Sequence, residues 1–115
     1  MNNRGGDLDL VFQALADPAR RMIVDRLCRG QASVSELARP LSMSLPSVMQ
    51  HLQVLEASGL ISTRKKGRVR TCSLDANALH GAEEWIGRRR SSWEHRLDRL
   101  TEFLAKRPSA AEEDA

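Results

Sequence analysis

Aromatic residues are scarce in this sequence, which has no tyrosine and in which phenylalanine, tryptophan and tyrosine together account for 3% of 115 residues. Leucine, valine, isoleucine, alanine and methionine must therefore fill any core. Long apolar runs are also missing, since none approaches the roughly 20 residues that a membrane-spanning helix needs. The start of the chain lacks the apolar segment of a secretory signal peptide. Together these absences predict a cytoplasmic protein that spans no membrane.

Cysteine is scarce as well, and Cys28 and Cys72 lie too far apart to form a metal-binding motif by spacing. Thiols in the cytosol are normally reduced, so we expect Cys28 to be a small core residue, with a thiol switch as the alternative. No Ser/His/Asp set, phosphate-binding loop or inward-facing pair of carboxylates is apparent, which argues against an enzyme. We expect neither a metal nor another cofactor.

Charge is distributed unevenly along the chain. The formal net charge is +3 although Glu112, Glu113 and Asp114 contribute three negative charges, so the rest of the chain carries +6. Lysine and arginine make the phosphate contacts of nucleic-acid-binding proteins. A basic body with an acidic tail therefore favours a nucleic-acid partner.

The length suits a single domain, which we place at residues 8–105 between disordered tails at 1–7 and 106–115. A first, short amphipathic helix precedes Asp17 and Pro18. These two residues end it and start a second helix, because aspartate is a good N-cap and proline is favoured at the first helical position.

Two further helices are predicted in the middle of the chain. Ser33 and Glu36 form a capping box, which starts a third helix at Val34. After a tight turn at 42–44, a fourth helix runs from 45 to about 58. Its inner face is an apolar stripe at spacings of three and four residues, formed by Leu45, Val48, Leu52 and Leu55.

After Gly59 the apolar residues no longer follow the helical spacing of three and four residues. The segments 60–63 and 69–74 are rich in the isoleucine, valine and threonine typical of strands, and between them lies the basic run 64–68 with a glycine inside it. This pattern predicts a β-hairpin with a basic tip. The last segment, 76–105, returns to a long helical pattern.

This order predicts a mainly α protein of the α+β kind, a winged helix-turn-helix with five helices and a two-stranded β-hairpin wing between helices four and five. In such a layout the fourth helix reads DNA, and no acid occurs in it before Glu56. Its outer face, with the capping serine, offers side chains that can contact base edges or phosphates. They are Ser44, Pro46, Ser47, Met49, Gln50, His51 and Gln53. The alternative is an ordinary polar surface.

The wing offers basic side chains and has no acid between residues 62 and 73. The cations are Arg64, Lys65, Lys66, Arg68 and Arg70. They can neutralise phosphates or enter the minor groove. Because strand residues alternate faces, Arg68 and Arg70 are predicted to point the same way. The alternative is an edge strand kept soluble by its charges.

The last helix carries more apolar surface than one small subunit can cover, which predicts a twofold dimer with the first helix as a second contributor. The predicted interface consists of Leu10, Val11, Leu79, Ile86, Trp93, Leu97, Leu100 and Leu104. We call the members from the last helix the seam, because their spacings of seven, four and three residues approach those of a coiled coil. The alternative is packing within one chain.

Three stretches resemble the ArsR/SmtB family of regulators: LADPARRMI at 15–23, SVSELA at 33–38 and SVMQHLQVLEASGLI at 47–61. The dipeptide at 67–68 and the following strand fit the family's wing, and the resemblance covers roughly 8–104. It implies a homodimeric winged-helix repressor that binds an inverted repeat in double-stranded DNA, with control of its own gene left open. Dimer contacts in the family come from the first and last helices.

The chain departs from the family pattern in two respects. Met49 stands where many members have serine, so we expect a different base preference there. Ser35 and Ala38 occupy positions where arsenic and cadmium sensors carry a Cys-x-Cys pair, so the metal boxes look absent. His95 and Asp98 lie one turn apart, which keeps a zinc site across the dimer as an alternative. An alternative from a different functional class is a protein-interaction module that kept the fold and lost DNA binding.

Overall fold

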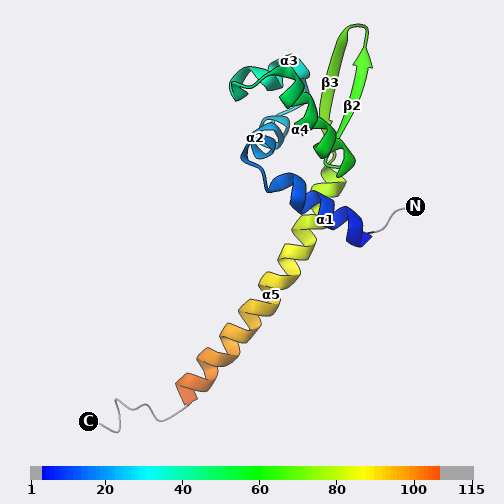
Figure 1. The fold of residues 1–115 in the computed structure, drawn as a ribbon. Helices are drawn as coiled ribbons and strands as arrows, with labels where there is room; N and C mark the ends of the chain where they lie inside the picture. Colours follow the sequence, from blue (N-terminus) through cyan, green and yellow to red (C-terminus); the bar gives the residue numbers. More distant parts are fainter. Residues whose placement is uncertain (1–3, 107–115) are drawn as a thin grey trace. The chain divides into compact units, whose positions relative to one another are not determined.

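The computed structural model describes residues 4–106, with side chains from Leu8 onward. It divides into two compact units, one up to Ala82 and one from Glu83. The elements are α1 (Arg4–Leu15), α2 (Pro18–Leu27), β1 (Ala32–Ser33), α3 (Val34–Ala38), the 3₁₀ turn η1 (Arg39–Leu41), α4 (Leu45–Ala57), β2 (Ile61–Lys66), β3 (Val69–Leu74) and α5 (Ala76–Lys106). Figure 1 labels the five α-helices and the two longer strands. The predicted mainly α, winged helix-turn-helix architecture is confirmed.

The first helix begins earlier than predicted. α1 starts at Arg4, so the last four residues of the predicted tail at 1–7 are helical. Residues 1–3 and 107–115 lie outside the described residues, and α5 ends at Lys106, one residue into the predicted C-terminal tail. The glycines at positions 5 and 6 weaken the helix signal, but each costs only about 1 kcal/mol relative to alanine in a helix.

Asp17 and Pro18 start α2 as predicted. The Asp17 carboxylate accepts hydrogen bonds from the backbone N–H groups of Ala19 and Arg20 at 2.8 and 3.2 Å. Pro18 occupies the first turn, where a backbone N–H has no partner within the helix. The backbone N–H of Arg20 is the main cause of a lowered pKa of Asp17, because hydrogen bonds to a carboxylate favour its charged form. The cap is therefore ionised at neutral pH.

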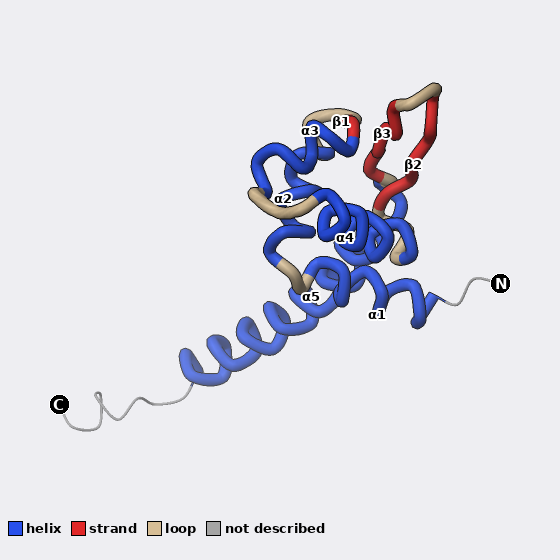
Figure 2. Tube along the Cα trace, turned by 45° about the horizontal axis from the view of Figure 1, so that its top comes forward, coloured by secondary structure: helices blue, strands red, loops and turns tan. Residues whose placement is uncertain are grey.

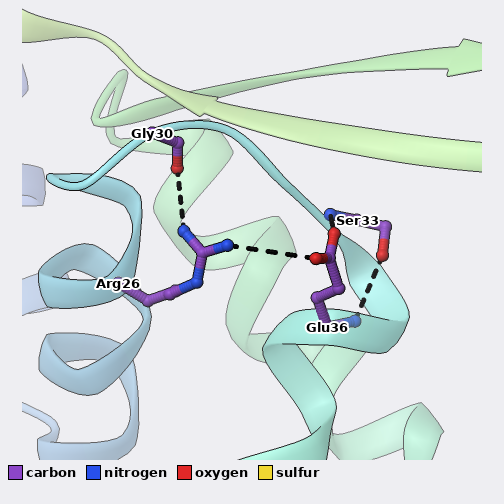
Figure 3. A network of polar contacts seen from close by, with 4 residues as sticks. All are labelled: Arg26, Gly30, Ser33 and Glu36. Atoms are coloured by element: carbon purple, nitrogen blue, oxygen red, sulfur yellow. Dashed lines mark hydrogen bonds and ion pairs between the residues drawn. The ribbon is translucent and has the colours of Figure 1, made fainter.

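A network of polar contacts fixes the start of α3 (Figure 3). The Ser33 hydroxyl accepts from the backbone N–H of Glu36 at 3.2 Å, and the Glu36 carboxylate accepts from the backbone N–H of Ser33 at 2.9 Å. This confirms the predicted capping box. Arg26 donates to the carbonyl of Gly30 at 3.1 Å and lies 4.0 Å from the Glu36 carboxylate. The turn that contains Pro40 is 3₁₀, so only the first of the two predicted turns is α-helical.

α4 ends in a Schellman motif. Gly59 adopts a positive φ of 85° and donates to the carbonyl of Glu56 at 3.0 Å, while Leu60 donates to the carbonyl of Leu55 at 3.1 Å. The buried Ser58 donates from its hydroxyl to the same Leu55 carbonyl at 2.7 Å. Leu60 is buried and leads directly into β2. The helix end therefore fixes where the wing begins.

The core gathers one face of each of the first four helices and the base of the sheet. Its buried members are Val11, Ala14, Ile23, Val24, Leu27, Ala32, Leu37, Val48, Leu52, Leu55, Leu60, Ile61, Cys72 and Ala82. They include most of the apolar stripe predicted for α4. Leu45 is the exception and is 55% exposed, because it is the first residue of the helix, where the chain has just left the turn.

The sheet has three antiparallel strands in the order β1-β3-β2 rather than the two predicted. β1 is two residues long and pairs Ala32 with Cys72 and Ser33 with Thr71. A strand of two residues is too short to show the alternating pattern from which a strand is predicted. β2 and β3 form the predicted hairpin, and β2 packs against α4 (Figure 2).

The hairpin is longer than predicted and its turn is tighter. β2 continues to Lys66, which pairs with Val69, so only Gly67 and Arg68 form the turn. Gly67 has a φ of 64°. A two-residue turn with glycine at its first position is typical of type II′, whose twist matches that of the strands.

α5 is the longest described helix, with 31 residues. Ala78, Leu79 and Ala82, which belong to the first unit, pack in or against its core. From Glu83 onward most side chains of α5 are exposed. Among residues 4–106, no helix combines the length and the apolar character needed to cross a membrane.

Candidate nucleic-acid interface

A tight turn joins η1 to α4 and completes the helix-turn-helix. Ser42 has a φ of 53°, and among residues 4–106 it is the only non-glycine residue with a positive φ. Ser44 caps α4, because its hydroxyl oxygen accepts from the backbone N–H of Ser47 at 3.3 Å. The hydroxyls of Ser44 and Ser47 are also hydrogen-bonded to each other at 3.0 Å. These two predicted contact residues thus define the N-terminus of α4.

The outer face of α4 is less uniform than predicted. Met49 is half-buried and packs against the core, because it lies one turn from Leu52 at the edge of the apolar stripe. His51 is half-buried too, and its Nδ1 lies 3.2 Å from Nη1 of Arg20 in α2. The exposed members of this face are Pro46, Gln50 and Gln53. They are the side chains best placed to meet a partner.

The register of the hairpin divides the wing cations between two faces. Lys65 is paired directly with Arg70, so these two share one face, and strand alternation puts Arg64 and Lys66 on the other. Arg68 lies in the turn. The alternation on which its predicted alignment with Arg70 rested therefore does not apply to it. All five side chains are exposed.

A chain of hydrogen bonds connects the wing to the end of α4. Thr63 in β2 donates from its hydroxyl to the Glu56 carboxylate at 3.1 Å, and it accepts from Nη1 of Arg70 in β3 at 3.2 Å. Glu56 is the only acid between Leu37 and Leu74. The single negative charge of this stretch is thus held at the base of the wing, and Arg70 has a structural contact besides any contact with a partner.

Several exposed apolar side chains near this surface, Val69 and Met43 among them, were not predicted as site residues. Val69, at the start of β3 beside Arg68, is 52% exposed, and Met43 lies exposed in the turn before α4. The strand pattern could not reveal the position of Val69, because that position depends on where the hairpin turns.

Known proteins share the sequence of this region. Residues 15–64 match the family model described as a helix-turn-helix domain. The HTH-type transcriptional regulator Rv2034 of Mycobacterium tuberculosis is 48% identical over 71 residues, which cover 62% of this chain and 66% of that protein. The transcriptional repressor SdpR of Bacillus subtilis is 34% identical over 76 residues, which cover 66% of this chain and 84% of SdpR.

Solved structures share the arrangement of the elements. The ArsR family transcriptional regulator RHA00566 has 48% sequence identity and a TM-score of 0.75, covering 82% of this chain and 97% of that one. The chain belongs to the ArsR family of transcriptional regulators. The homodimeric winged helix-turn-helix DNA-binding domain of Mb0332 from Mycobacterium bovis has 25% identity and a TM-score of 0.61, covering 83% of this chain and 93% of that one. The resemblance seen in the sequence is confirmed.

The residues predicted to form the dimer interface of this ArsR-family protein differ in their exposure to solvent. Leu10 in α1 is exposed, but Val11 is 3% exposed and belongs to the core, so its prediction is wrong. Neighbouring helical residues point about 100° apart, which separates the two. Leu79 is half-buried against the same core. The exposed seam in the second unit consists of Ile86, Trp93, Leu97, Leu100 and Leu104, and the exposed Phe103, which the regular spacing missed, lies next to Leu104.

The metal and thiol alternatives for this ArsR-family chain depend on where its histidine, cysteine and acidic side chains lie. Within the described part of the chain, no group of three or more His, Cys, Asp or Glu residues is placed to hold an ion. Cys28 is exposed at the end of α2 rather than in the core, so that prediction is wrong, and Cys72 is the buried cysteine. Burial, with the Glu56 carboxylate as a further cause, raises the pKa of the Cys72 thiol. A protonated, buried thiol is a poor nucleophile.

A shallow hollow between α2 and α3 has a volume of about 260 Å³. Its lining consists of Met22, Ile23, Asp25, Arg26, Arg29, Leu37, Pro40 and Leu41. Ligand pockets usually measure roughly 300–1,000 Å³. The exposed face of α4 and the wing, which carries the amides and cations described above, is the candidate functional site of the ArsR-family protein.

Proposed function

We propose that this ArsR-family protein is a homodimeric repressor that binds an inverted-repeat operator with α4 and the wing. The observation that carries the proposal is the charge of the segment between Leu37 and Leu74, which has six cations and one acid. That acid, Glu56, is hydrogen-bonded to Thr63. A surface of this composition attracts phosphates and offers them almost no repulsion.

The exposed side chains divide between the tasks that DNA recognition requires. Gln50 and Gln53 carry amides that can make paired hydrogen bonds to adenine in the major groove. The wing cations are suited to phosphates or to a narrow minor groove. Phosphate contacts set the register of the protein on the duplex and base contacts select the sequence. Both kinds of contact are available on one compact unit.

The exposed seam supports the dimer. A contiguous apolar stripe on a solvated helix is unfavourable unless a partner covers it, and the spacings of the seam suit pairing with a second helix. The related Mb0332 domain is a homodimer, and the related SdpR is a repressor. A twofold dimer places its two recognition helices on half-sites related by the same symmetry. An inverted repeat is the operator that fits this geometry.

The proposal is tested by incubating the purified protein with sheared genomic DNA, sequencing the retained fragments and footprinting them together with the promoter of its own gene. We expect a protected inverted repeat, with an affinity that falls steeply as salt rises, since each subunit neutralises several phosphates. If no fragment is retained even at low salt, the fold serves protein interaction instead. If all fragments are retained equally without a footprint, the protein has no operator.

Arg68→Ala is expected to weaken binding to the operator and to unrelated DNA alike, because a residue at the wing tip contacts phosphate or the minor groove rather than a unique base edge. The slope of log affinity against log salt should fall by about 1. Arg29→Ala, at an exposed arginine outside the interface, is the matched control and should keep the wild-type slope. Equal slopes in all three proteins would contradict the wing contact.

Gln50→Ala is expected to change which operator sequences are preferred. Gln50 is exposed in the middle of α4, and loss of a paired contact to adenine should lower operator affinity by about tenfold. Affinity for unrelated DNA should change little. Gel shifts with a set of single-base operator variants measure both effects. An equal loss on every sequence would assign Gln50 to the phosphate backbone instead.

A further inference from the structure

Arg20, in the first turn of α2, caps the preceding helix. Its Nε donates to the carbonyl oxygen of Ala14 at 2.7 Å, and its Nη2 donates to that of Gln13 at 3.1 Å. Both acceptors lie in the last turn of α1, where carbonyls have no partner within the helix. A cation at this end of a helix is also favoured by the helix dipole. Two of the three guanidinium nitrogens thus hold the end of α1.

The third nitrogen of Arg20 reaches α4. Nη1 lies 3.2 Å from Nδ1 of His51. A guanidinium can only donate hydrogen bonds, so Nδ1 must be the acceptor, and the proton of the neutral imidazole is then on Nε2. The Asp17 carboxylate, which accepts from the backbone N–H of Arg20, holds the start of α2 at the same junction. Three helices therefore meet at one side chain.

This contact differs in kind from the contacts that bury α4. Val48, Leu52 and Leu55 attach the helix to the core through apolar burial, which has no preferred direction. A hydrogen bond depends on both distance and angle, and His51 lies next to Leu52 in the middle of the helix. The bond from Arg20 therefore limits how far α4 can rotate or slide relative to α1.

We propose that Arg20 is a positioning residue for DNA recognition, which fixes α4 relative to α1 through Nδ1 of His51. His51 then acts through its inner nitrogen and not as a reader of bases. The inference rests on the proposed function, because it concerns the same recognition helix. The contacts of Arg20 also join α1, which carries the exposed Leu10, a predicted dimer residue, to α4, the proposed recognition helix.

Two replacements of His51 separate the roles of its ring nitrogens, because the asparagine amide can take the place of Nδ1 and the glutamine amide that of Nε2. We expect His51→Asn to keep operator affinity within about threefold, and His51→Gln to lose about tenfold, the effect of one hydrogen bond to a charged group. Arg20→Gln should lose at least as much. If glutamine preserves binding and asparagine does not, His51 is a DNA contact and the proposal is overturned.

Arg21→Gln is the matched control. Arg21 also caps α1, since its Nη1 donates to the carbonyl of Leu15 at 2.8 Å, but its described hydrogen bonds do not extend to α4. We expect it to lower the melting temperature as Arg20→Gln does while leaving DNA affinity unchanged. Equal losses of affinity in both variants would reduce Arg20 to a helix cap and overturn its positioning role.

A measurement without DNA distinguishes this inference from the proposed function. In the free protein, the ¹⁵N chemical shifts of the His51 ring should show an unprotonated Nδ1, and they should change in Arg20→Gln. A proton on Nδ1 of the neutral ring would refute the contact even in a protein that binds DNA. A wild-type protein that binds no DNA would instead remove the proposed function and, with it, the role of Arg20, whatever the ring shows.

Discussion

Replacing Leu97 and Leu100 together by glutamate is expected to separate the proposed dimer into monomers and to lower operator affinity by about a hundredfold. Both leucines are exposed in the seam. A second copy packed on them would have to bury the new carboxylates against apolar side chains, which is strongly unfavourable without a partner for the charge. A monomer keeps one recognition helix and loses the second half-site.

Analytical ultracentrifugation and gel shifts measure the two effects of this change. Ser91→Glu combined with His95→Glu is the matched control, because it places two acids on the opposite side of the same exposed helix. The control should remain dimeric and bind DNA normally. If the Leu97 and Leu100 variant stays dimeric, another surface holds the two copies together.

Leu55→Ala is expected to lower the free energy of unfolding by about 3 kcal/mol, as truncation of a fully buried leucine usually does. Leu55 has no exposed surface and lies where α4 turns into the wing. The loss is large beside the total stability of a small domain, which is typically about 5–15 kcal/mol. DNA binding should therefore fall only under conditions in which the destabilised domain begins to unfold.

Leu45→Ala is the control for this measurement, because it makes the same chemical change in the same helix at an exposed leucine. Its effect should stay within about 0.5 kcal/mol. Chemical denaturation of both variants should be compared at one protomer concentration, since association stabilises the folded state by mass action. Equal destabilisation by the two changes would mean that the inner face of α4 has been assigned wrongly.

Helix starts marked by a capping residue were the features best predicted from the sequence. Asp17 with Pro18, Ser33 with Glu36, and Ser44 each begin a helix where the pattern placed it. A cap involves residues no more than three positions apart, so its signal is complete within a short window. The same is true of the glycine that ends α4.

Features that depend on distant segments could not be predicted in the same way. β1 exists because Ala32 pairs with Cys72, and neither residue carries a local sign of that pairing. The choice of Cys72 over Cys28 as the core cysteine follows from the same contact. A short amphipathic pattern does not reveal which neighbour its apolar face meets, so the sequence predicts Val11 at the dimer interface whereas it lies in the core.

The candidate site likewise combines features that local sequence predicts with features that depend on distant segments. Its two elements, α4 and the wing, were located from periodicity and charge. That Met49 packs on the core, that His51 is bonded to Arg20 and that Arg70 is bonded to Thr63 all follow from side chains brought together by folding. Composition identifies the surface, whereas geometry decides which of its residues are available to a partner.

The Schellman end of α4 has a consequence for the nucleic acid as well as for the protein. Gly59 and Leu60 leave no flexible linker between the helix and β2, and Thr63 fastens the strand to Glu56. In the proposed complex, a helix in the major groove and a wing over the adjacent groove would then be held at a fixed spacing. The duplex would have to adapt its groove width to that spacing, so bases that no side chain touches would affect affinity through their stiffness.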